Sequence, residues 1–220
     1  MMPSGVVIAH RAGNSLERLA SAGAVADVVE ADVHLFRGRL EVRHAKTLGP
    51  FPRLWERWYL LERDTPRLPL EEVLAAADPG IALMLDLKGA DPRLPRAVLA
   101  AARERLAGPG LIVSGRIWRT VERLRGTPGI QTLHSVGSRR QLRALLRRHP
   151  PGSLEGVSVR RELLTSGIAS ALRERAPRLW SWPVDDLDTA RTLAAWGVTG
   201  FISDAPERLR TPRADGPATE

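Results

Sequence analysis

Short apolar runs alternate with amphipathic segments along most of the chain. Each run is rich in Val, Ile and Leu and is bounded by turn residues, which predicts a buried strand. Each amphipathic segment carries apolar residues at helical spacing, which predicts a helix packed on the strands. The predicted strands are 6–10, 28–35, 81–88, 111–115, 130–136, 156–160, 179–184 and 200–203. The predicted helices are 15–24, 69–77, 94–106, 118–125, 138–149, 166–175 and 187–196.

The alternation of strands with helices implies a parallel sheet. Eight strands in this pattern favour an α/β fold, a single-domain (β/α)8 TIM barrel over residues 1–210. A doubly wound open sheet would alternate in the same way. No G-x-G-x-x-G or G-x-x-x-x-G-K-[ST] follows a strand, which removes the usual signs of nucleotide binding. Residues 211–220 are polar and rich in Pro and Gly, and we expect them to be disordered.

One region interrupts the alternation. The strand at 28–35 is followed by a turn at Arg37-Gly38 and a returning strand at 39–44. Residues 45–69 are irregular, and we expect a loop with a short helix there. We interpret their aromatic side chains as a small satellite core, with a lid or membrane-touching flap as the alternative. These aromatic residues are Trp55, Trp58 and Tyr59.

Composition narrows the classes of function. The net charge is +8 and the pI about 11.2, but the basic residues are nearly all Arg and are scattered among acidic and apolar residues, so we expect no nucleic-acid partner. The chain has no cysteine, which excludes disulfides and thiolate metal sites. We see no signal peptide and no apolar run of about 18 residues, and we expect a cytoplasmic protein without stable membrane insertion. The oligomeric state stays open.

The most informative stretch is the second predicted strand. Glu30, Asp32 and His34 are spaced two apart, so they point to one face of that strand. Two buried carboxylates side by side repel, and a shared divalent cation such as Mg²⁺ or Ca²⁺ relieves the repulsion. Taken alone, the Glu-x-Asp pair is a weak signal, and it favours one carboxylate exposed at a strand end.

Neighbouring strand ends change that balance. The first strand ends in His10-Arg11 and the third in Asp86 and Lys88, while His44 closes the returning strand. In a TIM barrel these carboxyl ends meet at one mouth. Three carboxylates suit a divalent metal, an Arg and a Lys suit a phosphate, and two histidines suit acid–base work. The assembled set indicates metal-assisted phosphoester hydrolysis.

The order of these motifs resembles the glycerophosphodiester phosphodiesterase family, within the phosphatidylinositol-phosphodiesterase-like TIM-barrel superfamily. The resemblance covers about residues 5–207, and its motifs are VVIAHRAGNS, ADVVEADVHL, LEVRH and WSWPVDDLDTARTLAAWGVTGFISDAP. It implies hydrolysis of a small-molecule glycerophosphodiester, such as glycerophosphocholine, to glycerol 3-phosphate and an alcohol. A glycerol hydroxyl is an alternative first nucleophile. The implied roles are acid–base catalysis for His10 and His44, metal binding (Mg²⁺ or Ca²⁺) for Glu30, Asp32 and Asp86, and phosphate or substrate binding for Arg11, Lys88 and Trp182.

Several positions depart from the family pattern. Ala45 stands where an Asp usually follows the second histidine, and we hypothesise that His34 compensates for its absence. Asp86 replaces the more usual Glu, and Ser114-Gly115 replaces Ser-Phe. The loop after His10-Arg11 is also shorter than in the family and ends in Asn14-Ser15. Ala45 and this shortened loop keep open a weakened barrel that binds a phosphorylated metabolite. A lysophospholipase D-type activity on lipid phosphodiesters is a further alternative, and it predicts an apolar channel beside residues 55–59.

Purely structural roles are alternatives to the functional roles of Arg11, Lys88 and Trp182, and we also expect one for His134. Arg11 would pair with Asp204, and Lys88 would neutralise Asp86. Trp182 would pack in the core. His134 is interpreted as a pocket wall or a hydrogen-bonded core histidine.

Overall fold

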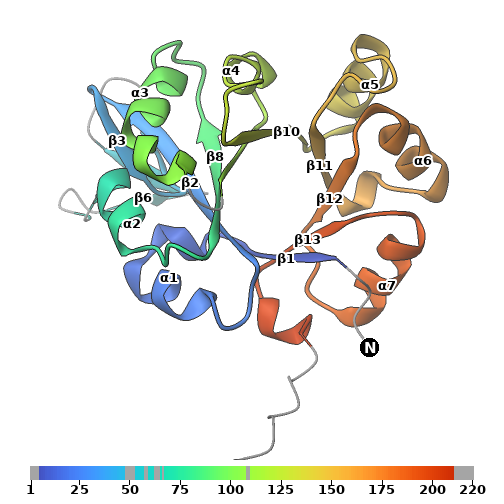
Figure 1. Cartoon of the computed structure of the whole chain (residues 1–220), viewed down its shortest axis with the longest axis horizontal. Helices are drawn as coiled ribbons and strands as arrows, with labels where there is room; N and C mark the ends of the chain where they lie inside the picture. The colour runs from blue at the N-terminus through green and yellow to red at the C-terminus, as the bar shows by residue number, and fades with distance from the viewer. Residues whose placement is uncertain are drawn as a thin grey trace, which may run out of the picture.

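Eight parallel strands form a closed barrel in the computed structural model, which describes residues 5–47, 53–56, 59–61, 65, 67–107 and 110–210 (Figure 1). The strands are β1 (Val6–Ala9), β2 (Val28–Phe36), β8 (Ala82–Lys88), β9 (Leu111–Gly115), β10 (Ile130–Val136), β11 (Gly156–Arg160), β12 (Arg178–Trp182) and β13 (Gly200–Ser203). Each pairs with the next in that order, and β13 pairs with β1. The predicted (β/α)8 barrel is confirmed, and the open sheet is excluded.

The helices lie outside the strands and follow one another round the barrel (Figure 1). They are α1 (Leu16–Ala22), α2 (Leu70–Ala76), α3 (Leu94–Ala101), α4 (Trp118–Glu122), α5 (Arg139–Arg148), α6 (Ser166–Arg175) and α7 (Leu187–Ala195). Short 3-10 turns accompany them at Ala12–Asn14, Arg103–Ala107, Arg161–Leu163 and Pro206–Arg208. Side-chain N-caps open four of the helices, because each oxygen accepts a backbone N–H three residues on. These caps are Ser15, Ser138, Thr165 and Asp186.

Strand alternation sorts the side chains into two cores. Along β2, Val29, Ala31 and Val33 pack outward under the helices, while Val28 packs inside the barrel. The inner cluster takes one residue from almost every barrel strand, namely Ile8, Val28, Met84, Ile112, Leu133, Trp180 and Ile202. Because this apolar layer fills the barrel, the polar residues that follow it on the inward face gather at the carboxyl end of the barrel.

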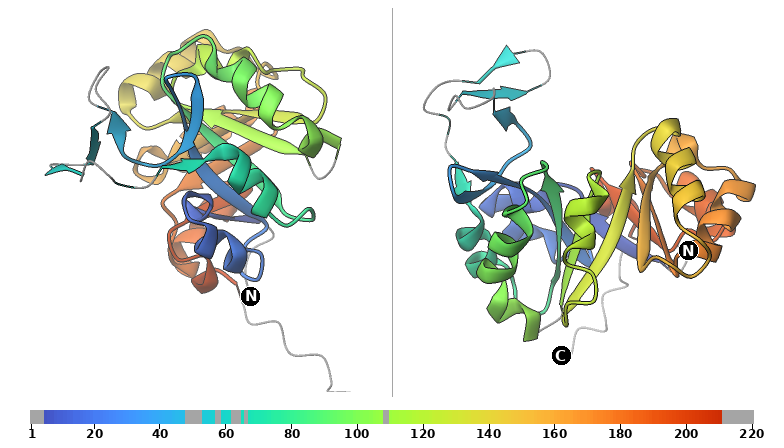
Figure 2. Two further views of the ribbon diagram at one scale, coloured as in Figure 1. Left: turned by 90° about the vertical axis from the view of Figure 1, so that its left-hand side faces the viewer. Right: turned by 90° about the horizontal axis from the view of Figure 1, so that it is seen from above.

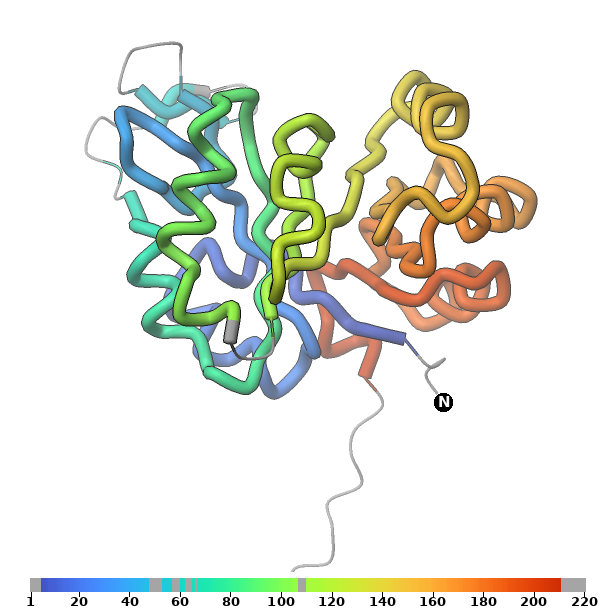
Figure 3. The backbone as a smooth tube through the Cα atoms, turned by 45° about the horizontal axis from the view of Figure 1, so that its top comes forward, coloured from blue at the N-terminus to red at the C-terminus, as the bar shows by residue number. Residues whose placement is uncertain are grey.

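A hairpin extends the barrel beside β2. After the turn at Arg37-Gly38, β3 (Arg39–Val42) runs antiparallel to β2, and β7 (Leu68–Pro69) pairs with β3. The predicted returning strand is confirmed. On the other side of β1, the barrel closes where β1 (blue) lies beside β13 (red) (Figure 3).

Short strands, and no helix, occupy the described part of 45–69 that precedes β7. Strands β4 (Lys46–Thr47), β5 (Leu54–Glu56) and β6 (Tyr59–Leu60) form a small antiparallel sheet that stands off the barrel (Figure 2). The expected short helix is therefore wrong for these residues. Trp55 is 40% exposed and belongs to neither buried cluster, so it does not form a satellite core. Trp58 and the Tyr59 side chain lie outside the described residues.

Two other sequence expectations concern the membrane and the chain end. Within the described ranges, every helix is too short or too polar to cross a bilayer. The segment 211–220, expected to be disordered, lies outside the described residues.

Candidate active site

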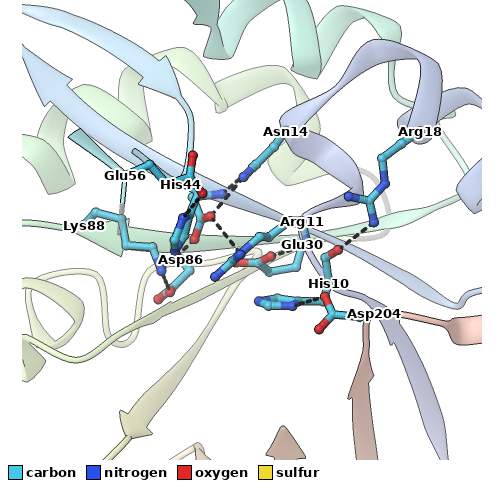
Figure 4. Close-up of polar contacts among 11 residues, drawn as sticks. His10, Arg11, Asn14, Arg18, Glu30, His44, Glu56, Asp86, Lys88 and Asp204 are labelled. Atoms are coloured by element: carbon cyan, nitrogen blue, oxygen red, sulfur yellow. Dashed lines mark hydrogen bonds and ion pairs between the residues drawn. The ribbon is translucent and has the colours of Figure 1, made fainter. Parts of the chain in front are cut away.

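A cavity of about 540 Å³ lies at the carboxyl ends of the barrel strands. It gathers residues that the sequence singled out on five separate segments of the chain. Its walls include His10, Arg11, Glu30, His34, His44, Asp86, Lys88 and Trp182. Asp32 is only 1% exposed and contacts Arg11 and Lys88 from behind this wall. Figure 4 shows how the polar side chains converge.

Strand register brings the three predicted carboxylates together. β2 and β8 pair in parallel, with Asp32 opposite Asp86. Glu30 lies two residues before Asp32, on the same inward face of β2. Each of the three offers an oxygen within 4.8 Å of the others. Glu30 and Asp32 are buried, and Asp86 is partly exposed toward the cavity.

Asn14 and Arg11 fix the two buried carboxylates. The Asn14 amide donates to Asp32 Oδ2 at 2.9 Å and accepts the Asp32 backbone N–H at 2.9 Å. The Arg11 backbone N–H donates to Glu30 Oε2 at 2.6 Å, and the Arg11 guanidinium Nε lies 3.4 Å from Asp32 Oδ2. Arg11 therefore pairs with Asp32, and the alternative pairing with Asp204 is wrong.

The loop after β1 makes these contacts through its backbone. Arg11 has a left-handed conformation with φ 54°, which an L-residue adopts only at a cost. A Cβ at Gly13 would lie 2.8 Å from Ala31 Cβ and 3.1 Å from the Glu30 carbonyl. Gly13 therefore lets the loop press against β2, and that close approach delivers Asn14 to Asp32.

Lys88 is the counter-ion of this cluster. Its ammonium contacts the Asp86 carboxylate directly and lies 2.6 Å from Asp32 Oδ1. Burial opposes its charge, but Asp86, Asp32 and Glu30 outweigh burial and raise the pKa of Lys88. The predicted neutralisation of Asp86 is thus present, and it extends to Asp32. Ser114 Oγ also donates to Asp86 Oδ1 at 2.9 Å.

The cluster still carries more negative charge than one lysine balances. Burial, and then the Asp32 charge, raise the pKa of Glu30 well above its ordinary value. Burial opposes ionisation of Asp32, yet Lys88, Asn14 and Arg11 hold its pKa below its ordinary value. Asp32 Oδ1 is buried and accepts no well-aligned hydrogen bond. Its close partner is the Lys88 ammonium at 2.6 Å, and an all-oxygen set of three adjacent carboxylates fits a hard divalent cation, Mg²⁺ or Ca²⁺.

His10 has a carboxylate partner from the far end of the chain. Its Nδ1 lies 2.7 Å from Asp204 Oδ1, a residue 194 positions later. Asp185 in turn accepts from the Asp204 backbone N–H and from Ser203 Oγ, both at 2.8 Å. Burial lowers the pKa of His10, and the hydrogen bond to Asp204 partly offsets that effect.

His44 has a partner of the same kind. Its Nδ1 lies 2.9 Å from Glu56 Oε1 on β5. A carboxylate at Nδ1 fixes the tautomer and the ring plane and leaves Nε2 as the reactive nitrogen. Glu56 thus supplies a contact that Ala45 cannot make. Sequence reasoning missed Glu56, because it lies twelve positions after His44 with no periodic pattern between them.

His34 and Trp182 also line the cavity, but neither has a hydrogen bond or ion pair to a described carboxylate. His34 Nε2 is buried without a hydrogen-bond partner among the described residues, and burial lowers the pKa of His34 to about 3. His34 is therefore neutral and lines the wall. Trp182 is partly buried at the end of β12, and the Arg116 guanidinium lies 5.1 Å from its ring centroid.

His134 lies outside this cavity. It follows the inward-facing Leu133, so it points outward, and its Nε2 lies 3.1 Å from Glu122 Oε1. Its ring centroid is 5.2 Å from that of His149. The pocket-wall interpretation is wrong, and the hydrogen-bonded interpretation holds for one nitrogen only, because Nδ1 has no partner within the described ranges.

The structure is similar to solved structures of phosphodiesterases. No protein-family model and no curated protein matches the chain. An Oleispira antarctica phosphodiesterase in complex with the product sn-glycerol-3-phosphate is 20% identical, with TM-score 0.69, over 94% of this chain and 95% of that one. A Thermotoga maritima glycerophosphodiester phosphodiesterase is 19% identical, with TM-score 0.69, over 92% and 96%. An Agrobacterium tumefaciens glycerophosphodiester phosphodiesterase is 17% identical, with TM-score 0.60, over 93% and 99%.

These likenesses establish the fold. The chain is a TIM barrel of the kind seen in glycerophosphodiester phosphodiesterases, and it aligns with those barrels over nearly the full length of both chains.

Proposed function

We propose that this protein is a metal-dependent phosphodiesterase that hydrolyses glycerophosphodiesters to glycerol 3-phosphate and an alcohol. One observation carries the proposal: two histidines, each with Nδ1 held by a carboxylate, line the same cavity as a three-carboxylate cluster and two cations. The chemistry of that set matches a phosphodiester with two ester oxygens and a negative charge.

Glu30, Asp32 and Asp86 would hold one Mg²⁺ or Ca²⁺. When bound, this ion supplies Lewis-acid polarisation of the phosphoryl group and charge neutralisation. Burial beside Asp32 raises the pKa of Glu30, so this carboxylate is one that a bound cation would stabilise. Lys88, whose ammonium contacts Asp32 and Asp86 at the cavity wall, would bind the substrate phosphate.

Arg11 and Lys88 orient the phosphate. Both line the cavity beside the carboxylates, and both are anchored by Asp32. The Arg11 fork can bind two phosphate oxygens at once, whereas the Lys88 ammonium acts as a point charge. Trp182 contributes an apolar face on the opposite wall, where carbon atoms of the substrate would pack.

His10 and His44 perform the proton transfers. One imidazole accepts the proton of the attacking oxygen through Nε2, and the other donates a proton to the leaving alcohol. Each ring is held in the required tautomer by its carboxylate, Asp204 for His10 and Glu56 for His44. The lowered pKa of His10 keeps that ring largely neutral near pH 7.

The Glu56 contact bears on the weakened-barrel alternative. That alternative rested on Ala45 and on the shortened loop after His10-Arg11. Ala45 removes the usual partner of the second histidine, and Glu56 takes that place at 2.9 Å. For the lipid alternative, the cavity wall includes Lys46 and Thr47 but not the described Trp55.

The test is release of glycerol 3-phosphate from glycerophosphocholine by the purified protein. We expect turnover with Mg²⁺ or Ca²⁺, loss of turnover with EDTA, and loss in His10→Ala. His149→Ala, which removes a histidine outside the cavity, is the matched control and should retain activity. A folded protein that turns over neither this diester nor a panel of others with either metal would overturn the proposal and favour the metabolite-binding barrel.

A further inference from the structure

A second hollow, of about 420 Å³, lies between α4 and α5. Its lining is dominated by arginine, and no acidic residue belongs to it among the described residues. The lining consists of Arg116, Ile117, Trp118, Arg119, Arg140, Gln141, Ala144 and Arg148. The four guanidinium groups around this hollow repel one another, and an anion bound there would be attracted electrostatically to all four.

This hollow adjoins the cavity of the candidate active site, because Arg116 and Ile117 line both spaces. The Arg116 guanidinium lies over the Trp182 ring at 5.1 Å, and Gly137 makes room for it, because a Cβ there would be 2.8 Å from Arg116 Cζ. Arg116 therefore links the Trp182 wall of the cavity to the arginine hollow.

Helical spacing on α5 builds the hollow. Arg140, Ala144 and Arg148 are four residues apart and form one row, which faces the hollow. Ala144 has the short side chain of this row and leaves the space between the two arginines open. A second row, Arg139, Arg143 and Arg147, contributes nothing to the lining. The hydrophilic face of α5 thus has two chemically similar sides, and only one borders a cavity.

The charges of the hollow are uncompensated by the protein. None of Arg116, Arg119, Arg140 and Arg148 forms an ion pair with a described residue. The same holds for Arg139, Arg143 and Arg147 on the other side of α5, so the four are distinguished by lining one hollow. Guanidinium groups bind phosphate oxygens in a bidentate fork, so an external phosphate is the group that this arrangement fits.

We propose that the arginine hollow is a subsite for a second anionic group of the substrate, located on the alcohol side of the scissile phosphodiester. This inference rests on the proposed phosphodiesterase function and narrows its substrate class. The preferred substrate is a glycerophosphodiester whose alcohol itself carries a phosphate or phosphodiester. A cationic alcohol such as choline is disfavoured there, because it would meet the same positive field.

The test compares two substrates with opposite alcohol charge. Glycerophosphocholine carries a cationic alcohol, and bis(glycerophospho)glycerol carries a second phosphodiester. We expect kcat/KM to be at least about tenfold higher for bis(glycerophospho)glycerol at low salt. This preference should narrow as ionic strength rises from about 0.05 M to about 0.5 M, because exposed charges are screened over that range.

A matched pair of double variants on α5 separates the subsite from overall charge. Arg140→Gln/Arg148→Gln removes two charges from the hollow, and Arg143→Gln/Arg147→Gln removes two from the other row. We expect the first pair to lower the ratio of the two kcat/KM values at least about fivefold and the second to leave it unchanged. Equal ratios in all three proteins, or equal losses in both variants, would overturn the subsite.

Binding distinguishes this inference from failure of the proposed function. If no diester is hydrolysed, isothermal titration with bis(glycerophospho)glycerol is run on the wild-type protein and on both double variants. Affinity lost only in Arg140→Gln/Arg148→Gln would support an anion subsite in a protein that is not a phosphodiesterase. Equal affinity in all three would overturn the subsite independently of catalysis.

Discussion

Replacing Glu56 tests whether His44 depends on a carboxylate held by a different strand. The two side chains meet at 2.9 Å and are 35% and 29% exposed for His44 and Glu56. A charge-assisted hydrogen bond contributes about 1.5–3 kcal/mol, and solvent screening at this exposure reduces the value to about 1–2 kcal/mol. At about 1.4 kcal/mol per factor of ten, kcat should fall about 5- to 30-fold.

The two substitutions at Glu56 should differ in a set order. Glu56→Gln keeps an oxygen that accepts from Nδ1 but loses the charge, so we expect about a fivefold loss of kcat. Glu56→Ala removes both, so we expect about a thirtyfold loss. Because Glu56 contacts His44 and not the substrate cavity, KM for glycerophosphocholine should stay within about twofold.

The assay is steady-state release of glycerol 3-phosphate, with kcat and KM determined separately. Glu71→Gln on α2 is the control, because Glu71 is an exposed glutamate without a described partner. Far-ultraviolet circular dichroism and the melting temperature check that each variant folds. A kcat for Glu56→Ala within twofold of wild type would refute the positioning role of Glu56. It would favour the weakened-barrel alternative, in which Ala45 leaves His44 without an effective carboxylate partner.

Three other perturbations probe the same structure. Asp204→Asn removes the group that raises the pKa of His10 against burial, so the limb of the pH–rate profile that titrates His10 should move to lower pH; an unmoved limb would contradict the pairing. His34→Ala should lower activity while the melting temperature is retained, and full activity would contradict the hypothesis that His34 compensates for the acidic residue absent at position 45. Leu85→Ala, at a fully buried outer-core position, should reduce the free energy of unfolding by about 2–5 kcal/mol in urea titration, and a loss below about 1 kcal/mol would contradict tight packing there.

Local sequence pattern was sufficient to predict the barrel and the charged residues of the candidate site on β1, β2 and β8. Glu30 and Asp32 are readable because strand alternation places them on one face, and the strand-end rule then adds His10, Arg11, Asp86 and Lys88. Helix caps such as Ser15 are readable for the same reason, since the interacting atoms lie within one turn.

The partners of the two cavity histidines were beyond local pattern. His10 meets Asp204 only because β13 closes onto β1, and His44 meets Glu56 only because β5 of the small sheet lies beside His44. The Asn14 amide likewise holds Asp32 from the loop after β1. Hydrogen bonds of this kind depend on loop geometry, which amphipathic periodicity does not encode.

The pairing of β1 with β13 makes one histidine–carboxylate contact depend on nearly the whole chain. During synthesis His10 is made early and Asp204 nearly last, and Asp204 is itself held by Asp185. The three clustered carboxylates, by contrast, all come from β2 and β8, in the first half of the chain. A chain truncated before β13 therefore keeps all three carboxylates but loses the partner of His10.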